Sequence, residues 1–468
     1  MIVSRRTALL AGAGAATLGA TGVGYLALSA GDPPEPLPAP VPPGKTRWSN
    51  WSGLQTCMAE SIAVPADVEA LQQVLKTSTG QIRPVGAGHS FTGLVPTNGT
   101  IVSLDRLNAL IAHDAEKLTA TVGAGIRLAK LGETLWQTGQ SMDTLPDINK
   151  QSLAGAIATA THGAGRELGA LSSAVTGLEL MTADGDLVAC NAENNRDLFD
   201  AARVSLGALG IITSIRLQNR APLRLKRRTW FEPIADAIAA ADERSRAHRH
   251  FEFYYVTFTG MAYCIAHDET SETETPRGAN AENQGTEDLM TLRDWLSWAP
   301  SLRRMVAQDL IANQETETAV GPAWRLLSTD RPKRFNEMEY HLPREALSGC
   351  LESVIATVER HSEVYFPIEI RFVAADDAWL SPFYQRPSAS IAVHMGHTQD
   401  HAFFFSEIEP IFRRHEGRPH WGKLHSLGGE DLAALYPRWT DFTAMRAEHD
   451  PKGRLLNPHL HHVFDLAR

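Results

Sequence analysis

The sequence predicts an α+β fold of two domains, and three observations support that prediction. The chain has 468 residues, more than one hydrophobic core usually organises. Helix and strand patterns alternate along the chain up to about residue 220. Beyond that point, aromatic residues alternate with others in residues 250–258 and again around residues 367–373, which indicates strands of a second sheet.

The first region mixes short helices and strands. Apolar residues at helical spacing predict helices over residues 66–76 and 126–138. Strands are predicted over residues 81–85, 101–104, 118–122, 175–182, 186–190 and 210–218. Asp184 and Gly185 separate two of these strands and favour a tight hairpin. In the second region, residues 267–288 are acidic without apolar periodicity, so we expect a mobile surface loop there.

The N-terminus has the pattern of an export signal. Ser4-Arg5-Arg6 precedes an apolar run from Thr7 to Ala30 that is rich in Ala, Gly and Leu. The pattern resembles a twin-arginine signal, which predicts export to the periplasm or another extracytoplasmic space. The alternative is an uncleaved membrane anchor, because the run is long enough to span a bilayer. Residues 31–47 follow, and their many prolines predict an extended linker.

Composition narrows the classes of function. With 43% hydrophobic and 21% charged residues, the bulk of the chain is typical of a folded globular protein. The net charge of -10 comes without a basic stretch, which argues against a nucleic-acid partner. The cysteines lie far apart without CxxC spacing, so no metal site is indicated.

The first candidate site is the segment RPVGAGHSF, residues 83–91. Gly86 and Gly88 would let backbone N–H groups approach a pyrophosphate closely, and Ser90 adds a hydroxyl donor. The alternative is an ordinary glycine turn that carries a surface histidine, His89.

The second candidate site is LPDINKQSLAGAIATATHGAG, residues 145–165. Its small residues leave room for a flat ring or a diphosphate to lie against the backbone. Close packing of helices is the alternative explanation. His162 is interpreted as a structural hydrogen-bonding residue rather than a base.

The third candidate site combines residues of the C-terminal half. Strand alternation puts Glu369 and Arg371 on one face, where a carboxylate and a cation can meet one ligand. His394 follows, and His420 and Lys423 belong to the motif HWGK. For Glu369 and Arg371 the alternative is a surface ion pair, which contributes little.

Together these segments resemble the aldonolactone and alditol oxidase branch (D-arabinono-1,4-lactone oxidase-like) of the vanillyl-alcohol oxidase flavoprotein family. The resemblance runs from about Trp48 to the C-terminus. Its specific parts are GAGHSF, SLAGAIATATHG, GALGIITSIRL, HWGK and RLLNP. The joint occurrence of these motifs in this order is far more specific than any one of them.

The resemblance implies an α/β FAD-binding domain of two sub-domains and a substrate (cap) domain on an antiparallel sheet. It divides the chain into five parts. These are the signal or anchor at 1–30, the linker at 31–47, the FAD-binding domain at 48–220, the cap at 221–419, and a C-terminal segment at 420–468 that returns to the flavin interface.

The resemblance also implies the roles of individual residues. A covalent bond would join His89 to FAD. The other cofactor-binding residues would be Gly86, Ala87, Gly88 and Ser90 at the diphosphate, Ser152, Gly155, Thr161 and His162 along the flavin, and Gly210 and Ile212 at the adenosine half. The catalytic residues would be Glu369, Arg371, His394 and Lys423, and substrate contacts would come from Ser152, Arg371 and His420.

The implied activity is oxidation of a sugar-derived alcohol, an aldonolactone or alditol, by hydride transfer to flavin N5. His394 or Glu369 would take the hydroxyl proton, while Arg371 and Lys423 would stabilise negative charge. Pro146 falls where oxidase members tend to have Gly or Pro, which favours O2 as acceptor and hydrogen peroxide as product. Two alternatives stay open: a dehydrogenase that reduces a quinone or cytochrome, and a protein of this fold that binds sugar without turnover.

Overall fold

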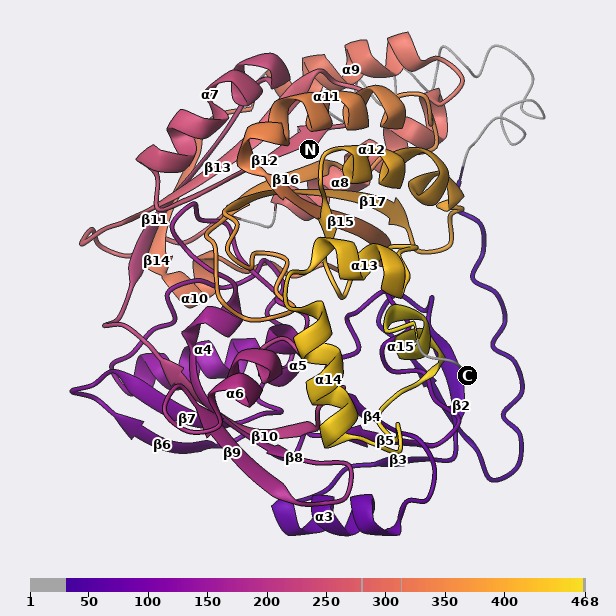
Figure 1. Cartoon of the computed structure of the whole chain (residues 1–468). Helices are drawn as coiled ribbons and strands as arrows, with labels where there is room; N and C mark the ends of the chain where they lie inside the picture. Colours follow the sequence, from indigo (N-terminus) through magenta and orange to yellow (C-terminus); the bar gives the residue numbers. More distant parts are fainter. Residues whose placement is uncertain (1–30, 279–280, 313, 466–468) are drawn as a thin grey trace, which may run out of the picture.

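The computed structural model describes residues 31–278, 281–312 and 314–465. Up to about residue 220 the chain builds a parallel sheet of three strands and an antiparallel sheet of five. An antiparallel sheet of eight strands follows. Figure 1 shows the two smaller sheets in the lower half of the molecule and the large sheet with its helices in the upper half. The predicted α+β class is confirmed.

The first part contains short elements. Its parallel sheet has the order β3 (Ser61–Ala63), β5 (Thr100–Ser103), β4 (Ile82–Val85). Its antiparallel sheet has the order β6 (Leu110–Asp114), β7 (Thr119–Gly123), β10 (Ile211–Gln218), β8 (Val175–Met181), β9 (Leu187–Asn191). Outside these sheets lie the hairpin β1 (Thr46–Ser49) and β2 (Thr56–Ala59), α3 (Val68–Thr77), α4 (Leu128–Gln137), α5 (Leu153–Ala158), η1 (Leu171–Ala174) and α6 (Arg196–Ala202).

The strands and helices predicted for this region are confirmed to within two residues at each end, and their local causes are visible. Helix α3 begins at Asp67, whose carboxylate accepts a hydrogen bond of 2.8 Å from the backbone N–H of Ala70. The hairpin β8–β9 turns through Gly185, whose φ of 91° is the left-handed conformation that glycine tolerates.

The eight-stranded sheet is antiparallel throughout and runs β14-β11-β13-β12-β16-β17-β15-β18. Its strands are β11 (Arg224–Pro233), β12 (His250–Val256), β13 (Met261–Glu269), β14 (Glu317–Pro322), β15 (Phe335–Pro343), β16 (Ile368–Val373), β17 (Ser388–Gly396) and β18 (Arg418–Pro419). Its helices are α7 (Ile234–Ala247), α8 (Ala281–Leu296), α9 (Pro300–Ala312), α10 (Ala323–Leu326), η2 (Arg344–Ala346), α11 (Leu347–Val358), η3 (Phe404–Ile408) and α12 (Glu409–Arg414). The two aromatic strands predicted from the sequence are β12 and β16.

The prediction of a loop over residues 267–288 is wrong at both ends. Strand β13 continues to Glu269, and α8 already begins at Ala281. The buried face of α8 is formed by Leu289, Leu292 and Leu296, all of which lie beyond residue 288. The first turns of α8 are acidic and contain none of these buried leucines, so their sequence alone has the pattern of a loop.

The chain returns to its first part after residue 420. Helices α13 (Gly429–Leu435), α14 (Trp439–His449) and α15 (Pro458–Val463) lie in this last segment, and α14 runs down beside α6 (Figure 1). Two backbone hydrogen bonds fix this return: Phe91 N–H donates to Gly422 O at 2.7 Å, and Ile82 N–H donates to Arg454 O at 2.8 Å.

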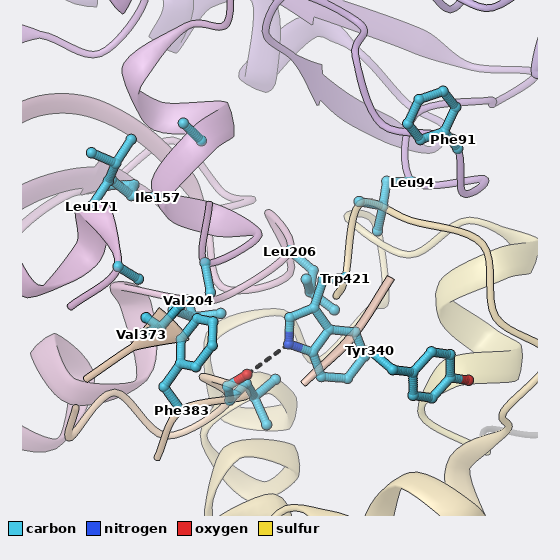
Figure 2. Packing of buried hydrophobic residues seen from close by; sticks show 14 of the residues in the cluster. Phe91, Leu94, Ile157, Leu171, Val204, Leu206, Tyr340, Val373, Phe383 and Trp421 are labelled. Atoms are coloured by element: carbon cyan, nitrogen blue, oxygen red, sulfur yellow. Dashed lines mark hydrogen bonds between the residues drawn. The ribbon is translucent and has the colours of Figure 1, made fainter. Parts of the chain in front are cut away.

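One hydrophobic core spans the parts. Trp421 is 1% exposed, and its indole N–H donates to Leu380 O at 2.6 Å. Figure 2 shows this side chain among residues from both halves, including Leu206 of the first part and Phe383 of the second. Burial of this shared apolar surface holds the halves together.

In the ranges that the structure describes, no helix is long and apolar enough to cross a bilayer. The predicted export signal or anchor at 1–30 lies outside those ranges.

Arg83 joins three segments of the chain. It is 1% exposed, and its Nε donates to Leu94 O and its Nη2 to Leu206 O, both at 2.7 Å. Its Nη1 donates to Gly207 O at 3.1 Å and also to Leu455 O in the C-terminal segment. A single guanidinium therefore satisfies four carbonyl groups, at least two of them buried.

Replacing Arg83 with Leu should lower the free energy of unfolding by about 3 kcal/mol or more, because buried carbonyls would lose their donors. Denaturant unfolding measures this, and limited proteolysis should show earlier cleavage after residue 420. Arg216→Leu, at an exposed position on β10, is the control and should change little. Equal stability of the two variants would contradict the role of Arg83.

Candidate active site

Two cavities meet between the first part and the eight-stranded sheet. Their volumes are about 370 Å³ and about 140 Å³. They share the lining residues Ile148, Gln151, Glu337, His420 and Lys423. A molecule in one cavity therefore lies next to a molecule in the other.

Every site residue suggested by the sequence lines one of these cavities. The smaller cavity is lined by Gly86, Ala87, Gly88, His89, Ser90, Ser152, Gly155, Gly210 and Ile212. The larger cavity is lined by Thr161, His162, Glu369, Arg371 and His394. His420 and Lys423 line both.

Glycines shape the smaller cavity. Gly88 has a φ of 69°, and its carbonyl accepts a hydrogen bond of 2.7 Å from Trp51 N–H. A Cβ on Gly86 would lie 2.1 Å from Ser152 Oγ, so only glycine allows this loop to pack against the start of α5. The turn thus has a backbone conformation that a larger residue would disturb.

The residues of the smaller cavity fit a dinucleotide with a flat ring system. Ser152 is 2% exposed, and its hydroxyl has no hydrogen-bond partner among the residues that the structure describes. A buried hydroxyl without a partner is costly, so a bound polar group is the natural acceptor or donor. The small residues and glycine backbone around it suit a diphosphate.

His89 lies in the wall of this cavity, which excludes the surface-histidine alternative. Its ring stacks on Trp51 with centroids 5.3 Å apart and an interplanar angle of 28°. Burial lowers the pKa of His89 to about 4, and the positive charges of Lys423 and Arg127 add to the effect. The imidazole is therefore neutral at neutral pH, with a lone pair available on one nitrogen.

Lys423 forms an ion pair with Glu337 on β15 where the cavities meet. Glu337 also faces His394 Nε2 at 3.5 Å. Burial raises the pKa of this carboxyl, but Lys423 and His394 outweigh that effect and lower it to about 2. Glu337 is therefore ionised at any physiological pH.

Two histidines have tautomers fixed by their hydrogen bonds. His394 Nδ1 lies 3.1 Å from Pro367 O, and since a carbonyl only accepts, this nitrogen donates. His420 Nδ1 accepts from Gly422 N–H at 3.0 Å, which leaves the proton on Nε2. Burial lowers the pKa of His420 to about 3, so this residue is a neutral donor.

His162 is held by oxygen atoms on both sides. Its Nε2 bonds to Glu339 Oε1 at 2.9 Å, and its Nδ1 bonds to Gly163 O at the same distance. Glu339 also accepts from Ser390, and Lys423 Nζ lies 3.9 Å from it. These bonds fix the histidine ring, in keeping with the structural role that we predicted for it.

Glu369 and Arg371 are buried, which rules out the surface ion-pair alternative. The two residues are 7% and 8% exposed and bond to each other on β16. Arg371 Nε also donates to Glu252 at 2.9 Å, and the hydroxyl of Tyr254 donates to Glu369. Although burial lowers the pKa of Arg371, its two carboxylate partners raise it well above the ordinary value.

Sequence reasoning missed several charged residues of the larger cavity. These are Glu337 and Glu339 on β15 and the ion pair of Asp147 with Arg331. Two half-buried residues of β12 were also missed: Tyr254, which lines the cavity, and Glu252, which bonds to Arg371. A signal for β15 was present in the sequence FNEMEYHLP. Its charged residues alternate with Met338 and Tyr340, so they share one face of a strand.

Comparisons with known proteins agree with this geometry. A family model described as "FAD binding domain" matches residues 59–191, and one described as "D-arabinono-1,4-lactone oxidase" matches residues 215–463. Among solved structures, a cholesterol oxidase from B. sterolicum has a TM-score of 0.71 at 15% identity. It covers 91% of this chain and 100% of its own, which shows a shared fold.

Curated relatives extend over nearly the whole chain. An L-gulono-1,4-lactone dehydrogenase of Mycobacterium tuberculosis is 34% identical over 89% of this chain and 99% of its own. An alditol oxidase of a Streptomyces species is 28% identical over 90% and 99%. An L-gulonolactone oxidase of Mus musculus is 28% identical over 89% and 98%.

Fold, site and relatives define a FAD-linked oxidoreductase that acts on CH–OH groups. The chain belongs to the D-arabinono-1,4-lactone oxidase family, in the aldonolactone oxidase branch of the vanillyl-alcohol oxidase flavoproteins. The resemblance stated from the sequence motifs is confirmed.

The depressed pKa of Glu337 predicts an acid-dependent loss of stability. The pair with Lys423 stabilises the fold above the ordinary carboxyl pKa of about 4.3, and this contribution is lost as pH falls through about 2. In Glu337→Gln the melting temperature should therefore fall less steeply between pH 5 and pH 2. Glu243→Gln, at an exposed position on α7, should keep the wild-type slope, and an unchanged slope in Glu337→Gln would contradict the prediction.

Proposed function

We propose that the protein oxidises a secondary alcohol of an aldonolactone or alditol in the larger cavity and uses O2 as acceptor, with FAD in the smaller cavity. The observation that carries the proposal is the shared wall of the two cavities, where Lys423, Glu337 and His420 stand. Bound FAD supplies a hydride acceptor at N5. The remaining tasks, removal of a proton and stabilisation of charge, fall to the protein.

His394 is the proton acceptor best placed for that task. When His394 is neutral and its Nδ1 donates to Pro367 O, its lone pair lies on Nε2, which is 3.5 Å from Glu337 in the cavity wall. A substrate hydroxyl that gives its proton to Nε2 creates an imidazolium, and Glu337 stabilises that charge at 3.5 Å. Glu369 is less suited, since it already accepts from Arg371 and Tyr254.

Lys423 and Arg371 contribute fixed positive charges to the site. Lys423 stands between the cavities, where negative charge develops on the reacting oxygen or on the reduced cofactor. Arg371 is held by Glu369 and Glu252, which fixes its remaining N–H groups as rigid donors to substrate hydroxyls. Ser152 and the Nε2–H of His420 are the other proposed contacts of the substrate.

We also propose that His89 is bonded to the C8-methyl group of FAD. The new C–N bond would replace a methyl C–H and the imidazole N–H, and the two electrons and two protons released would reduce O2 to hydrogen peroxide. The neutral ring and its position in the cavity wall support this, because only an unprotonated nitrogen has a lone pair to form the bond.

One experiment tests both the substrate and the electron acceptor. Purified protein is mixed with a panel of aldonolactones and alditols, while flavin bleaching, peroxide and dye reduction are recorded. We expect bleaching, O2 consumption and one peroxide per product. Pro146 lines the larger cavity, which supports O2 as the acceptor. The relative named a dehydrogenase favours the second candidate, a quinone or cytochrome reductase. Dye reduction without peroxide would establish that candidate, and no bleaching by any compound would indicate a binding protein.

The proposed location is extracytoplasmic, through the twin-arginine pattern of residues 1–30, with an uncleaved membrane anchor as the alternative. N-terminal sequencing of the exported protein distinguishes the two possibilities.

After acid precipitation, yellow flavin should stay with the wild-type protein. Replacing His89 with Ala should release the flavin to the supernatant and leave a slower, noncovalent enzyme, because alanine has no nitrogen that could bond to the cofactor. Flavin that remains with the precipitated variant would place the bond on another residue.

Replacing Lys423 with Ala should lower kcat at least about tenfold, since a preorganised charge at the reacting atoms is lost. Steady-state kinetics with the best substrate of the panel measure this loss. Lys452→Ala, which removes an exposed lysine paired with Asp184, serves as the matched control. A normal turnover in Lys423→Ala would exclude a catalytic role for this residue.

A further inference from the structure

Exposed apolar side chains gather at one end of the helical pair α8–α9. Of eight large hydrophobic residues that stand exposed in the described part of the chain, three are Trp298, Leu302 and Met305, with exposed fractions of 55%, 38% and 60%. Trp298 lies in the turn before α9, and Leu302 and Met305 are three residues apart on α9. Single exposed hydrophobic residues are common, but three within eight residues form a patch.

The other side of the same helical pair faces the larger cavity. Leu289 and Leu292 of α8 and Leu310 of α9 line the larger cavity together with the sheet. The pair is thus apolar on two sides, and only one of them is covered by the protein. Figure 1 shows α9 at the upper edge of the molecule, far from the two smaller sheets.

The described part of the chain begins at the end of α8 that precedes this patch. Asp32 forms an ion pair of 2.8 Å with Arg293, which is fully buried in the last turn of α8 and five residues from Trp298. The preceding residues 7–30 contain no Asp, Glu, Lys or Arg. In sequence, this uncharged stretch directly precedes the point where the described chain contacts the end of α8.

We propose that Trp298, Leu302 and Met305 dock on the surface of a lipid bilayer, on the side where residues 1–30 join the fold. A tryptophan flanked by leucine and methionine suits the boundary between headgroups and acyl chains, where a ring with an N–H group is favoured. The docking is peripheral: the patch lies on the surface, and α9 is a helix of 13 residues. The wall of the larger cavity then faces the membrane.

The test is vesicle flotation of the full-length protein with unilamellar vesicles of phosphatidylcholine and phosphatidylglycerol. The wild type should float, and residues 298–306 should gain protection from hydrogen exchange only when vesicles are present. In Leu302→Glu/Met305→Glu, vesicle partitioning should fall at least about tenfold, because two inserting side chains become charged.

The matched control is Ile111→Glu/Leu187→Glu. These residues are 60% and 48% exposed on β6 and β9, so the variant makes the same change of charge at the opposite end of the molecule. It should float like the wild type, and both variants should keep wild-type turnover in vesicle-free buffer. That turnover verifies folding.

Three results would overturn the proposal. Protection of residues 298–306 before vesicles are added would mean that the N-terminal segment covers the patch. Loss of a dimer in light scattering of the α9 variant, without vesicle binding by the wild type, would mean that a second copy covers it. Equal flotation of the wild type and the α9 variant would assign membrane binding to residues 1–30 alone.

Discussion

The pairing of buried charges at the cavity boundary is the constraint on which the rest of the site depends. Lys423 comes from the C-terminal segment, Glu337 and Glu339 from the eight-stranded sheet, and His162 from the first part of the chain. A buried carboxylate without a partner is strongly destabilising, so these segments must meet in one arrangement. The ion pairs therefore position the larger cavity against the smaller one.

The same pairing prepares the site for catalysis. Charges that are fixed before substrate arrives need no reorganisation when a proton and a hydride leave the alcohol. Glu337 stays ionised, because its pKa is lowered to about 2, and it can compensate positive charge on His394. His420 and His89 stay neutral, with pKa values lowered to about 3 and about 4, which suits the donor and nucleophile roles that we propose for them.

Much of the fold and part of the site could be predicted from the sequence, because their signals are local. The glycine turn around His89 and the hairpin at Gly185 depend on residues next to each other in the chain. The start of α8 was missed because the apolar face of that helix lies beyond its acidic first turns. Glu337 was missed because its importance comes from Lys423, which is 86 residues away along the chain. Only packing shows such pairs.

A crystal structure of the holoenzyme with a bound aldonolactone tests the central claim most directly. The isoalloxazine ring should lie where the cavities meet, between Ser152 and Lys423, with the lactone in the larger cavity and its reacting hydroxyl within hydrogen-bond distance of His394 Nε2. A ring bound away from Lys423, or a lactone outside the larger cavity, would contradict the claim that the two cavities form one active site.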